Sequence, residues 1–259
     1  MRRNIAPAEL ARDSRFHRIS TVERFSEPRP GGDERKMDPA APDVGERARR
    51  QMHGIFVGEI QALEGAGRTC FDYDTGAGSG EVPFALKLDM ARQCWDEARH
   101  VEISIKLGDH MGCGIGEYAE SVTLFEAACH DDPVFRLAGV NRALEGLAID
   151  VFNTMRDFGS SVDDPVLHFC EDWMLADEVT HVRMGSTWLR SLTEGDPDRR
   201  SRALEFQSAV DDMFNFRGAR GEGDEASIRL ARRFRTMAGF TDDEIDRIAE
   251  QAAAARQAS

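Results

Sequence analysis

Apolar side chains recur every three or four residues over most of the chain after residue 42, and no segment shows the alternation of a half-buried strand. This periodicity predicts long amphipathic helices and no strand ladder, so we expect an all-α fold. The expected helices span 43–70, 83–108, 133–158, 165–193, 197–216, 224–238 and 241–256. The longer connection 108–132 has room for one short helix near 118–129.

Proline positions mark several of the helix starts independently of the periodicity. Pro133, Pro165 and Pro197 each follow an aspartate, and Pro83 follows Glu81-Val82. An aspartate accepts hydrogen bonds from the free N–H groups of the first turn, and proline suits the first helical position. Thr241, with Glu244 three residues later, predicts a capping box at the start of the last helix.

The element order predicts two helical hairpins joined by a long crossover, followed by a helical tail. Residues 1–42 hold five of the nine prolines and form the expected irregular N-terminal arm, with one short helix near Pro7–Arg15. Residues 43–193 form the expected four-helix bundle. Residues 194–259 form a C-terminal helical extension that we expect to pack on the bundle.

Composition excludes several classes of protein. The formal charge of −14, from 33 Lys and Arg against 47 Asp and Glu, argues against nucleic acid as a partner. No apolar run is long enough to span a membrane, and no apolar segment follows the basic Met1-Arg2-Arg3 start, so we expect a cytoplasmic protein without a secretory signal. The five cysteines form no C-x-x-C pair, which argues against a zinc ribbon or an iron–sulfur cluster.

The strongest chemical signal is a pentapeptide that occurs twice. Residues 96–100 and 177–181 both have the pattern D-E-x-x-H, in the middle of a long predicted helix. With this composition the pattern is expected roughly 0.06 times per chain. A carboxylate and an imidazole three residues apart share one helix face, which is how a helix offers two ligands to a metal centre.

The other two bundle helices each carry one carboxylate on an apolar face. Glu59 interrupts the apolar stripe of the first helix, and Glu145 interrupts that of the third. A lone carboxylate on such a face is costly unless it is paired or bound to metal. Glu64 is the alternative in the first helix, although it lies out of phase with the stripe.

A carboxylate on one helix and a Glu-x-x-His motif on the next, repeated in each half, is the pattern of the di-iron carboxylate proteins. Over about residues 43–193 the chain resembles ferritin-like non-haem diiron proteins, and residues 96–100 resemble the D-E-x-R-H signature of bacterial diiron monooxygenases. Residues 176–183 and the tail ending in Met237-Ala-Gly-Phe240 are similar to a bacterial ferritin-like family of unknown function. The resemblance implies a ferritin-like four-helix bundle with a long crossover.

The resemblance also implies a ligand set and roles for its members. Glu59 and His100 would bind one metal, Glu145 and His181 the other, and Glu97 and Glu178 would bridge the two. Asp96 and Asp177 would accept a hydrogen bond from the ring N–H of a ligand histidine and fix its tautomer. The implied cofactors are two iron ions, or a manganese and an iron, with O₂ as co-substrate.

Four further residues share faces with these motifs. Met90, Cys94 and Met174 are candidates for the lining of a substrate cavity, with ordinary core packing as the alternative. Glu171, two turns before Glu178, is a candidate for the lining or for an additional ligand, with a carboxylate that is solvated or lies just behind the metal ligands as the alternative. The arginines at 229, 232, 233 and 235 predict a solvated face, or a docking site for an anion.

These features predict an O₂-activating non-haem diiron oxidase or oxygenase that hydroxylates, N-oxygenates or desaturates a small organic substrate. The expected partners are that substrate and an electron donor such as a ferredoxin or a flavin reductase, with a homodimer as the default assembly. A ferroxidase or rubrerythrin-like peroxidase is the first alternative, although the chain has no C-x-x-C rubredoxin module. A metal-free helical bundle stabilised by buried ion pairs is the second.

Overall fold

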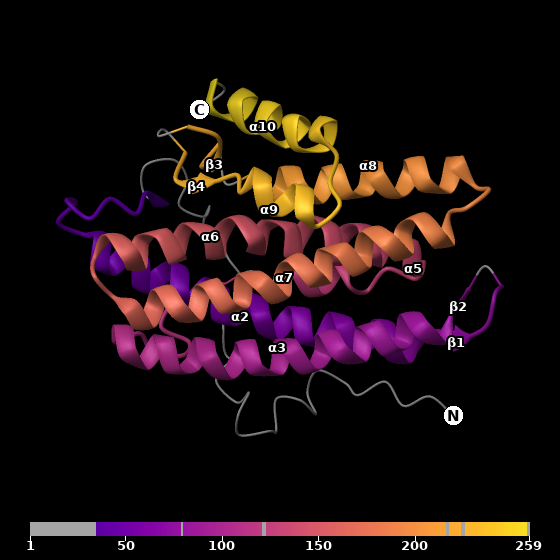
Figure 1. Cartoon of the computed structure of the whole chain (residues 1–259), viewed down its shortest axis with the longest axis horizontal. Coiled ribbons are helices and arrows are strands. Elements are labelled where there is room, and N and C mark those ends of the chain that lie inside the picture. Colours follow the sequence, from indigo (N-terminus) through magenta and orange to yellow (C-terminus); the bar gives the residue numbers. More distant parts are fainter. Residues whose placement is uncertain (1–34, 79, 121–122, 216–217, 224–225, 258–259) are drawn as a thin grey trace.

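Four long helical segments form two antiparallel hairpins in the computed structural model, which describes residues 35–78, 80–120, 123–215, 218–223 and 226–257 (Figure 1). The first hairpin pairs α2 with α3, and the second pairs the α5–η3–α6 segment with α7. The prediction of an all-α helical bundle is confirmed. The bundle helices and the short α4 of the crossover are α2 (Val44–Asp72), α3 (Phe84–Met111), α4 (Thr123–Ala127), α5 (Pro133–Arg136), η3 (Leu137–Leu144), α6 (Glu145–Ser161) and α7 (Pro165–Leu192).

The Asp-Pro pairs start three helices as the sequence predicts. The carboxylate of Asp132 accepts from the Val134 N–H, that of Asp164 from two N–H groups of its first turn, and that of Asp196 from the Arg199 N–H. Thr241 and Glu244 exchange the two hydrogen bonds of a capping box. Pro83 differs, because it precedes the first residue of α3 and no side chain caps that end.

Three helices follow the bundle and lie along the side formed by α6 and α7 (Figure 1). They are α8 (Pro197–Met213), α9 (Arg232–Met237) and α10 (Asp242–Gln257). The predicted helix over 224–238 is wrong in its first half: β4 (Ile228–Arg229) pairs in parallel with β3 (Arg220–Gly221) before α9 begins. A second two-residue pair, β1 (Asp74–Thr75) with β2 (Glu81–Val82), joins α2 to α3. Tertiary contacts stabilise these short strands, and the periodicity of the sequence does not predict the strands.

A buried ion-pair cluster fastens α9 to α6. Asp150 of α6 is fully buried and accepts from Arg235 at 2.7 and 2.9 Å and from Arg220 at 2.9 Å, and Arg220 also pairs with Asp211 at 3.1 Å. Arg235 also donates to the carbonyl of Gly146, next to Glu145. The prediction of a solvated arginine face is therefore wrong for Arg235, because its charge is neutralised inside the fold.

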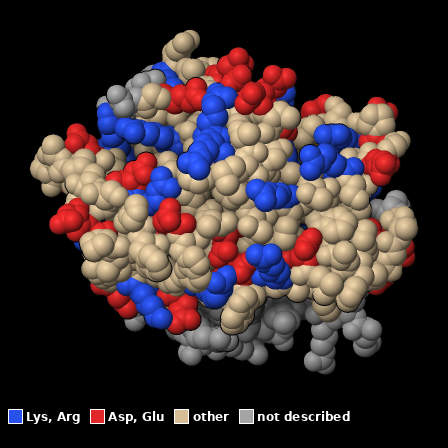
Figure 2. All heavy atoms as spheres, in the orientation of Figure 1, with Lys and Arg blue, Asp and Glu red and all other residues tan. Residues whose placement is uncertain are grey.

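The exposed charges on this side of the molecule are mixed in sign. Arg232 of α9 pairs with Glu222 and Asp246, and in Figure 2 basic and acidic side chains are interspersed over the face shown. No described helix is both long and apolar enough to cross a membrane. Residues 35–42 of the expected arm contain only turns and irregular backbone, and the helix expected near Pro7–Arg15 lies outside the described residues.

Candidate metal centre

The two D-E-x-x-H motifs face each other across the bundle interior. Glu97 and His100 project from the middle of α3, and Glu178 and His181 project from the middle of α7. All four side chains are completely buried. Apolar residues of the same helix faces, such as Val101 and Val182, pack around them, so the 3.6-residue periodicity that buries the core also buries the motifs.

Glu59 of α2 and Glu145 of α6 complete the site, at 5% and 3% exposure. One set of potential ligand atoms comes from Glu59, Glu97, His100 and Glu178, and a second from Glu97, Glu145, Glu178 and His181. Within each set the atoms lie within 4.8 Å of one another. Glu97 and Glu178 belong to both sets. The structure brings together all six residues that the sequence singled out, and Glu64 is not among them.

The donor atoms fit metal ions, because four buried carboxylates surround only two imidazoles. The Nδ1 atoms of His100 and His181 lie 3.1–3.5 Å from oxygens of Glu97 and Glu178, and Glu178 Oε2 has no hydrogen-bonding partner among the described residues. Burial of several carboxylates together is costly, and a bound cation reduces that cost. Carboxylate and imidazole donors suit iron, manganese and other divalent transition metals. This buried cluster can therefore hold a metal ion.

Each histidine is oriented by the aspartate of the opposite motif. His100 Nε2 lies 3.3 Å from Asp177, and His181 Nε2 lies 3.3 Å from Asp96, so the Nδ1 atom of both rings faces the glutamates. Arg99 pairs with both aspartates and stacks on Trp173, with 4.7 Å between guanidinium carbon and ring centroid. The aspartates thus favour the Nε2–H tautomer, which leaves Nδ1 free to bind metal.

The sequence analysis missed two buried amides, of which Gln93 contacts the carboxylates and Asn141 holds Gln93. Gln93 Nε2 donates to Glu145 at 3.0 Å and, more weakly, to Glu97 at 3.4 Å, while its oxygen accepts from Asn141 at 2.7 Å. Gln93 lies four residues before Glu97 on the same face of α3. An amide that interrupts an apolar face one turn from a ligand motif was the signal available in the sequence.

The third bundle segment is not a continuous α-helix, contrary to the prediction for 133–158. Residues Leu137–Leu144 form a π-helix, and the Glu145 N–H donates to the Val140 carbonyl, five residues back. The wider turn places Asn141 so close to α7 that a Cβ on Gly185 would lie 2.4 Å from the Asn141 Cβ. π-Helical turns are frequent at functional sites, and this one sets the orientation of Glu145.

The site carries protons when no metal is bound. Burial raises the pKa of Glu59 and Glu145 well above the ordinary value. Burial opposes charge on His100 and His181 too, but the surrounding carboxylates outweigh it and raise the pKa of both rings. Burial likewise raises the pKa of Glu97, but the two imidazoliums lower it more, so this carboxylate stays ionised.

A comparison with family models identifies the wider group of this chain. Residues 17–246 match the model described as "Protein of unknown function (DUF455)". The chain belongs to this family. No curated protein and no solved structure matches it. The family assignment therefore leaves the chemistry to be argued from the site.

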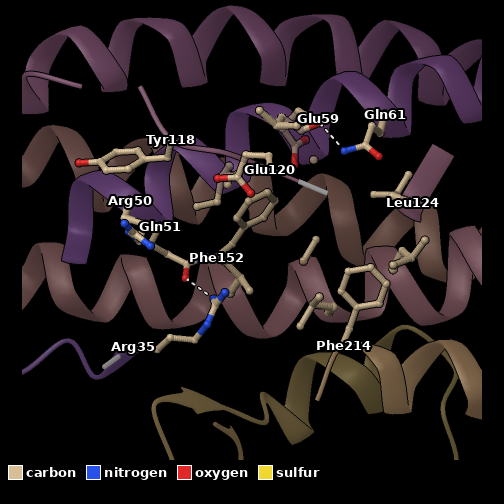
Figure 3. A pocket seen from close by; sticks show the side chains of 18 of the residues that line it. Arg35, Arg50, Gln51, Glu59, Gln61, Tyr118, Glu120, Leu124, Phe152 and Phe214 are labelled. Atoms are coloured by element: carbon tan, nitrogen blue, oxygen red, sulfur yellow. Dashed lines mark hydrogen bonds between the residues drawn. The ribbon is translucent and has the colours of Figure 1, made fainter. Parts of the chain in front are cut away.

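A cavity of about 400 Å³ extends from the surface to the six-residue cluster, and Figure 3 shows side chains that line it. Of the six residues, Glu59 and Glu145 line it. Its walls come from α2 and α6, with Tyr118, Glu120 and Leu124 contributed by the crossover. The cavity thus opens on the α2–α6 side of the cluster, and the histidines lie behind the glutamates on the α3–α7 side.

Met90, Cys94, Glu171 and Met174 do not line this cavity, although the sequence placed them near the site. Met90 and Met174 are fully buried in apolar packing. Burial raises the pKa of the Cys94 thiol to about 11, so it stays protonated. Both carboxyl oxygens of Glu171 are buried without a partner among the described residues, and burial raises its pKa well above the ordinary value. Glu171 is therefore not solvated, and its burial favours the neutral form of the carboxyl group.

Binding of divalent cations to the metal-free protein at pH 7 is expected to release protons. Glu59 and Glu145 each give up a carboxyl proton, and His100 and His181 each give up one ring proton, because only the deprotonated atoms bind metal. A lower pH leaves more protons to displace, so the apparent affinity should fall as the pH falls. Titration calorimetry with Mn(II) in two buffers of different protonation enthalpy measures the number. Release of less than about one proton would contradict this protonation state.

Proposed function

We propose that this protein is an O₂-activating non-haem diiron oxidase or oxygenase of the ferritin-like type, acting on a small organic substrate. The observation that carries the proposal is the pair of four-residue sets that share Glu97 and Glu178, buried at the inner end of a cavity. Shared carboxylates place two ions close together, and the cavity gives a small molecule access to them. When bound, a reduced iron pair supplies electrons to O₂.

The residues of the chain orient the metal ligands, balance the charge of the ions and exclude water from the reacting end of the cavity. The four glutamates offset the charge of two divalent cations, and the Asp–His pairs hold the imidazoles in a metal-binding tautomer. Phe152, Leu144 and Val151 line the cavity beside Glu145 and exclude water from the reacting end of a bound substrate. Arg99 holds the two aspartates in place from the outer side of the cluster.

Oxygen uptake by protein loaded with Fe(II) under anaerobic conditions tests the proposal. We expect about two irons per chain after desalting, rapid O₂ consumption on mixing, and renewed uptake each time a chemical reductant is added. The Glu145→Ala variant should consume O₂ far more slowly than the parent, because it removes a donor next to the cavity. Ferric iron that accumulates without renewed uptake would indicate a ferroxidase, and faster turnover with H₂O₂ than with O₂ would indicate a peroxidase. Either result would overturn the oxygenase proposal.

A further inference from the structure

Three small residues of α2 lie on the wall of the cavity. Gly54, Gly58 and Ala62 follow one another at intervals of four residues, and all three line the cavity. A glycine inside a helix costs about 1 kcal/mol relative to alanine, so its presence there needs a reason. A Cβ built on Gly58 would meet no atom within 4 Å. The side of α2 at Gly58 therefore faces open space one residue before Glu59.

The opposite walls are apolar. Leu144, Leu147 and Val151 come from the π-helix and α6, Leu124 comes from α4, and Phe214 lies just beyond α8. Glu59 and Glu145 lie at the inner end, and the carboxylate of Glu120 lies beside Gly54 on the α2 side. A volume of about 400 Å³ is within the range of natural small-molecule sites. The body of a bound molecule is therefore apolar.

The outer end of the cavity is lined by three arginines, Arg35, Arg47 and Arg50 (Figure 3 shows Arg35 and Arg50). Arg35 donates to Gln51, and Arg47 pairs with Asp43. The guanidinium of Arg50 stacks on the Tyr118 ring, 5.0 Å from its centroid. Stacking fixes the plane of the guanidinium and leaves its N–H edge available for a two-pronged contact with a carboxylate or phosphate.

The acidic side chains at this end are already engaged. Glu46 accepts from the Tyr118 hydroxyl at 2.7 Å and pairs with Arg49, and Glu120 pairs with His53 at 3.0 Å. Arg50 has no carboxylate within ion-pair distance in the described part of the chain. The mouth thus offers one oriented cation to an incoming anion.

Arg50 and Glu59 are nine residues apart on α2, which corresponds to an axial rise of about 14 Å. We propose that the cavity binds an apolar molecule with a terminal carboxylate or phosphate, whose charged end contacts Arg50 and whose apolar end lies against Glu59 and Glu145. The role of this molecule as substrate rests on the proposed function, whereas its binding to the cavity does not.

Calorimetry with four probes of equal chain length tests the binding: decanoate, decyl phosphate, decanol and decyltrimethylammonium. Both the metal-free protein and protein loaded with Mn(II) are titrated. The two anions should bind at least about tenfold more tightly than decanol, and the cation should not bind. The tighter of the two anions identifies the headgroup.

Variants locate the two ends of the ligand. Arg50→Gln should weaken anion binding about tenfold and leave decanol unchanged, whereas Arg202→Gln, at an exposed arginine of α8, should change neither. Gly58→Leu fills the cavity and should abolish binding of every probe, and Ala148→Phe on α6 fills it from the other wall. Any one of three results would overturn the proposal. The anions bind Arg50→Gln as tightly as they bind the parent, the probes still bind both cavity-filling variants, or the anions bind only when Mn(II) is present. The metal content of Arg50→Gln is measured as well. If it is near that of the parent, a change in anion binding comes from the cavity and not from loss of the metal site.

Discussion

Replacement of Glu97 by alanine is expected to reduce the metal content from about two ions per chain to below about 0.2 after desalting. Glu97 is fully buried in the centre of the site, and its carboxylate belongs to both potential ligand sets. Its loss therefore removes a donor from each ion at once. The measurement is plasma mass spectrometry of protein loaded anaerobically with Fe(II).

Two further variants show whether the effect is specific to the ligand. Glu102→Ala removes an exposed carboxylate from the same helix, and its metal content should equal that of the parent. Asp177→Asn keeps all six donors and alters the acceptor for His100 together with its ion pair to Arg99, so it should weaken affinity by about 10–100-fold. Full metal retention by a folded Glu97→Ala protein would exclude the dinuclear site and leave a bundle held by buried ion pairs.

Replacement of Asp150 by alanine is expected to destabilise the protein by about 3–5 kcal/mol, because it leaves Arg235 and Arg220 buried with too little opposing charge. Burial raises the pKa of Asp150, but the two arginines lower it more, and the net pKa is below the ordinary value. A depressed pKa means that this stabilisation is present at neutral pH and is lost as the pH falls through the folded-state pKa. Thermal unfolding should show a decrease in Tm of about 10 °C at pH 7.

The matched control is Asp157→Ala, at an exposed position on the same helix whose partner is the neighbouring Arg156. Its Tm should change by less than about 2 °C. Limited proteolysis of Asp150→Ala should cut first in the segment after α8, because the cluster fastens α9 to α6. An unchanged Tm in Asp150→Ala would mean that the cluster contributes no net stability.

The sequence identified best those residues whose structural role depends on neighbours only a few positions away in the chain. An Asp-Pro pair caps a helix through atoms within three residues, and Thr241 and Glu244 form their capping box in the same way. The spacing within D-E-x-x-H fixes which side chains share a helix face, whatever the helix packs against. For that reason the helices and the six clustered residues could be named before any tertiary contact was known. Their role as metal ligands stays a prediction.

The features that the sequence missed depend on contacts between distant segments. The turn at Leu137–Leu144 becomes a π-helix where it packs against Gly185 of α7, and Gln93 finds its role only across the bundle, at Glu145. Arg235 belongs to a basic run that is typical of a solvated face. Its partner Asp150 is 85 residues away, so the sequence around Arg235 does not indicate that it is buried. Likewise, nothing in the sequence of α3 or α7 indicates that the cavity opens between α2 and α6.

The sequence by itself therefore determined the helices, their order and the set of residues that could meet in the interior, because periodicity and capping act over a few residues. Only the tertiary structure decided which aspartate orients which histidine, how the C-terminal helices are fastened, and from which side a small molecule reaches the cluster. Those properties depend on the offset and rotation of one helix against another. Side-chain packing across the whole bundle sets the offset and rotation of the helices, and no local sequence pattern encodes them.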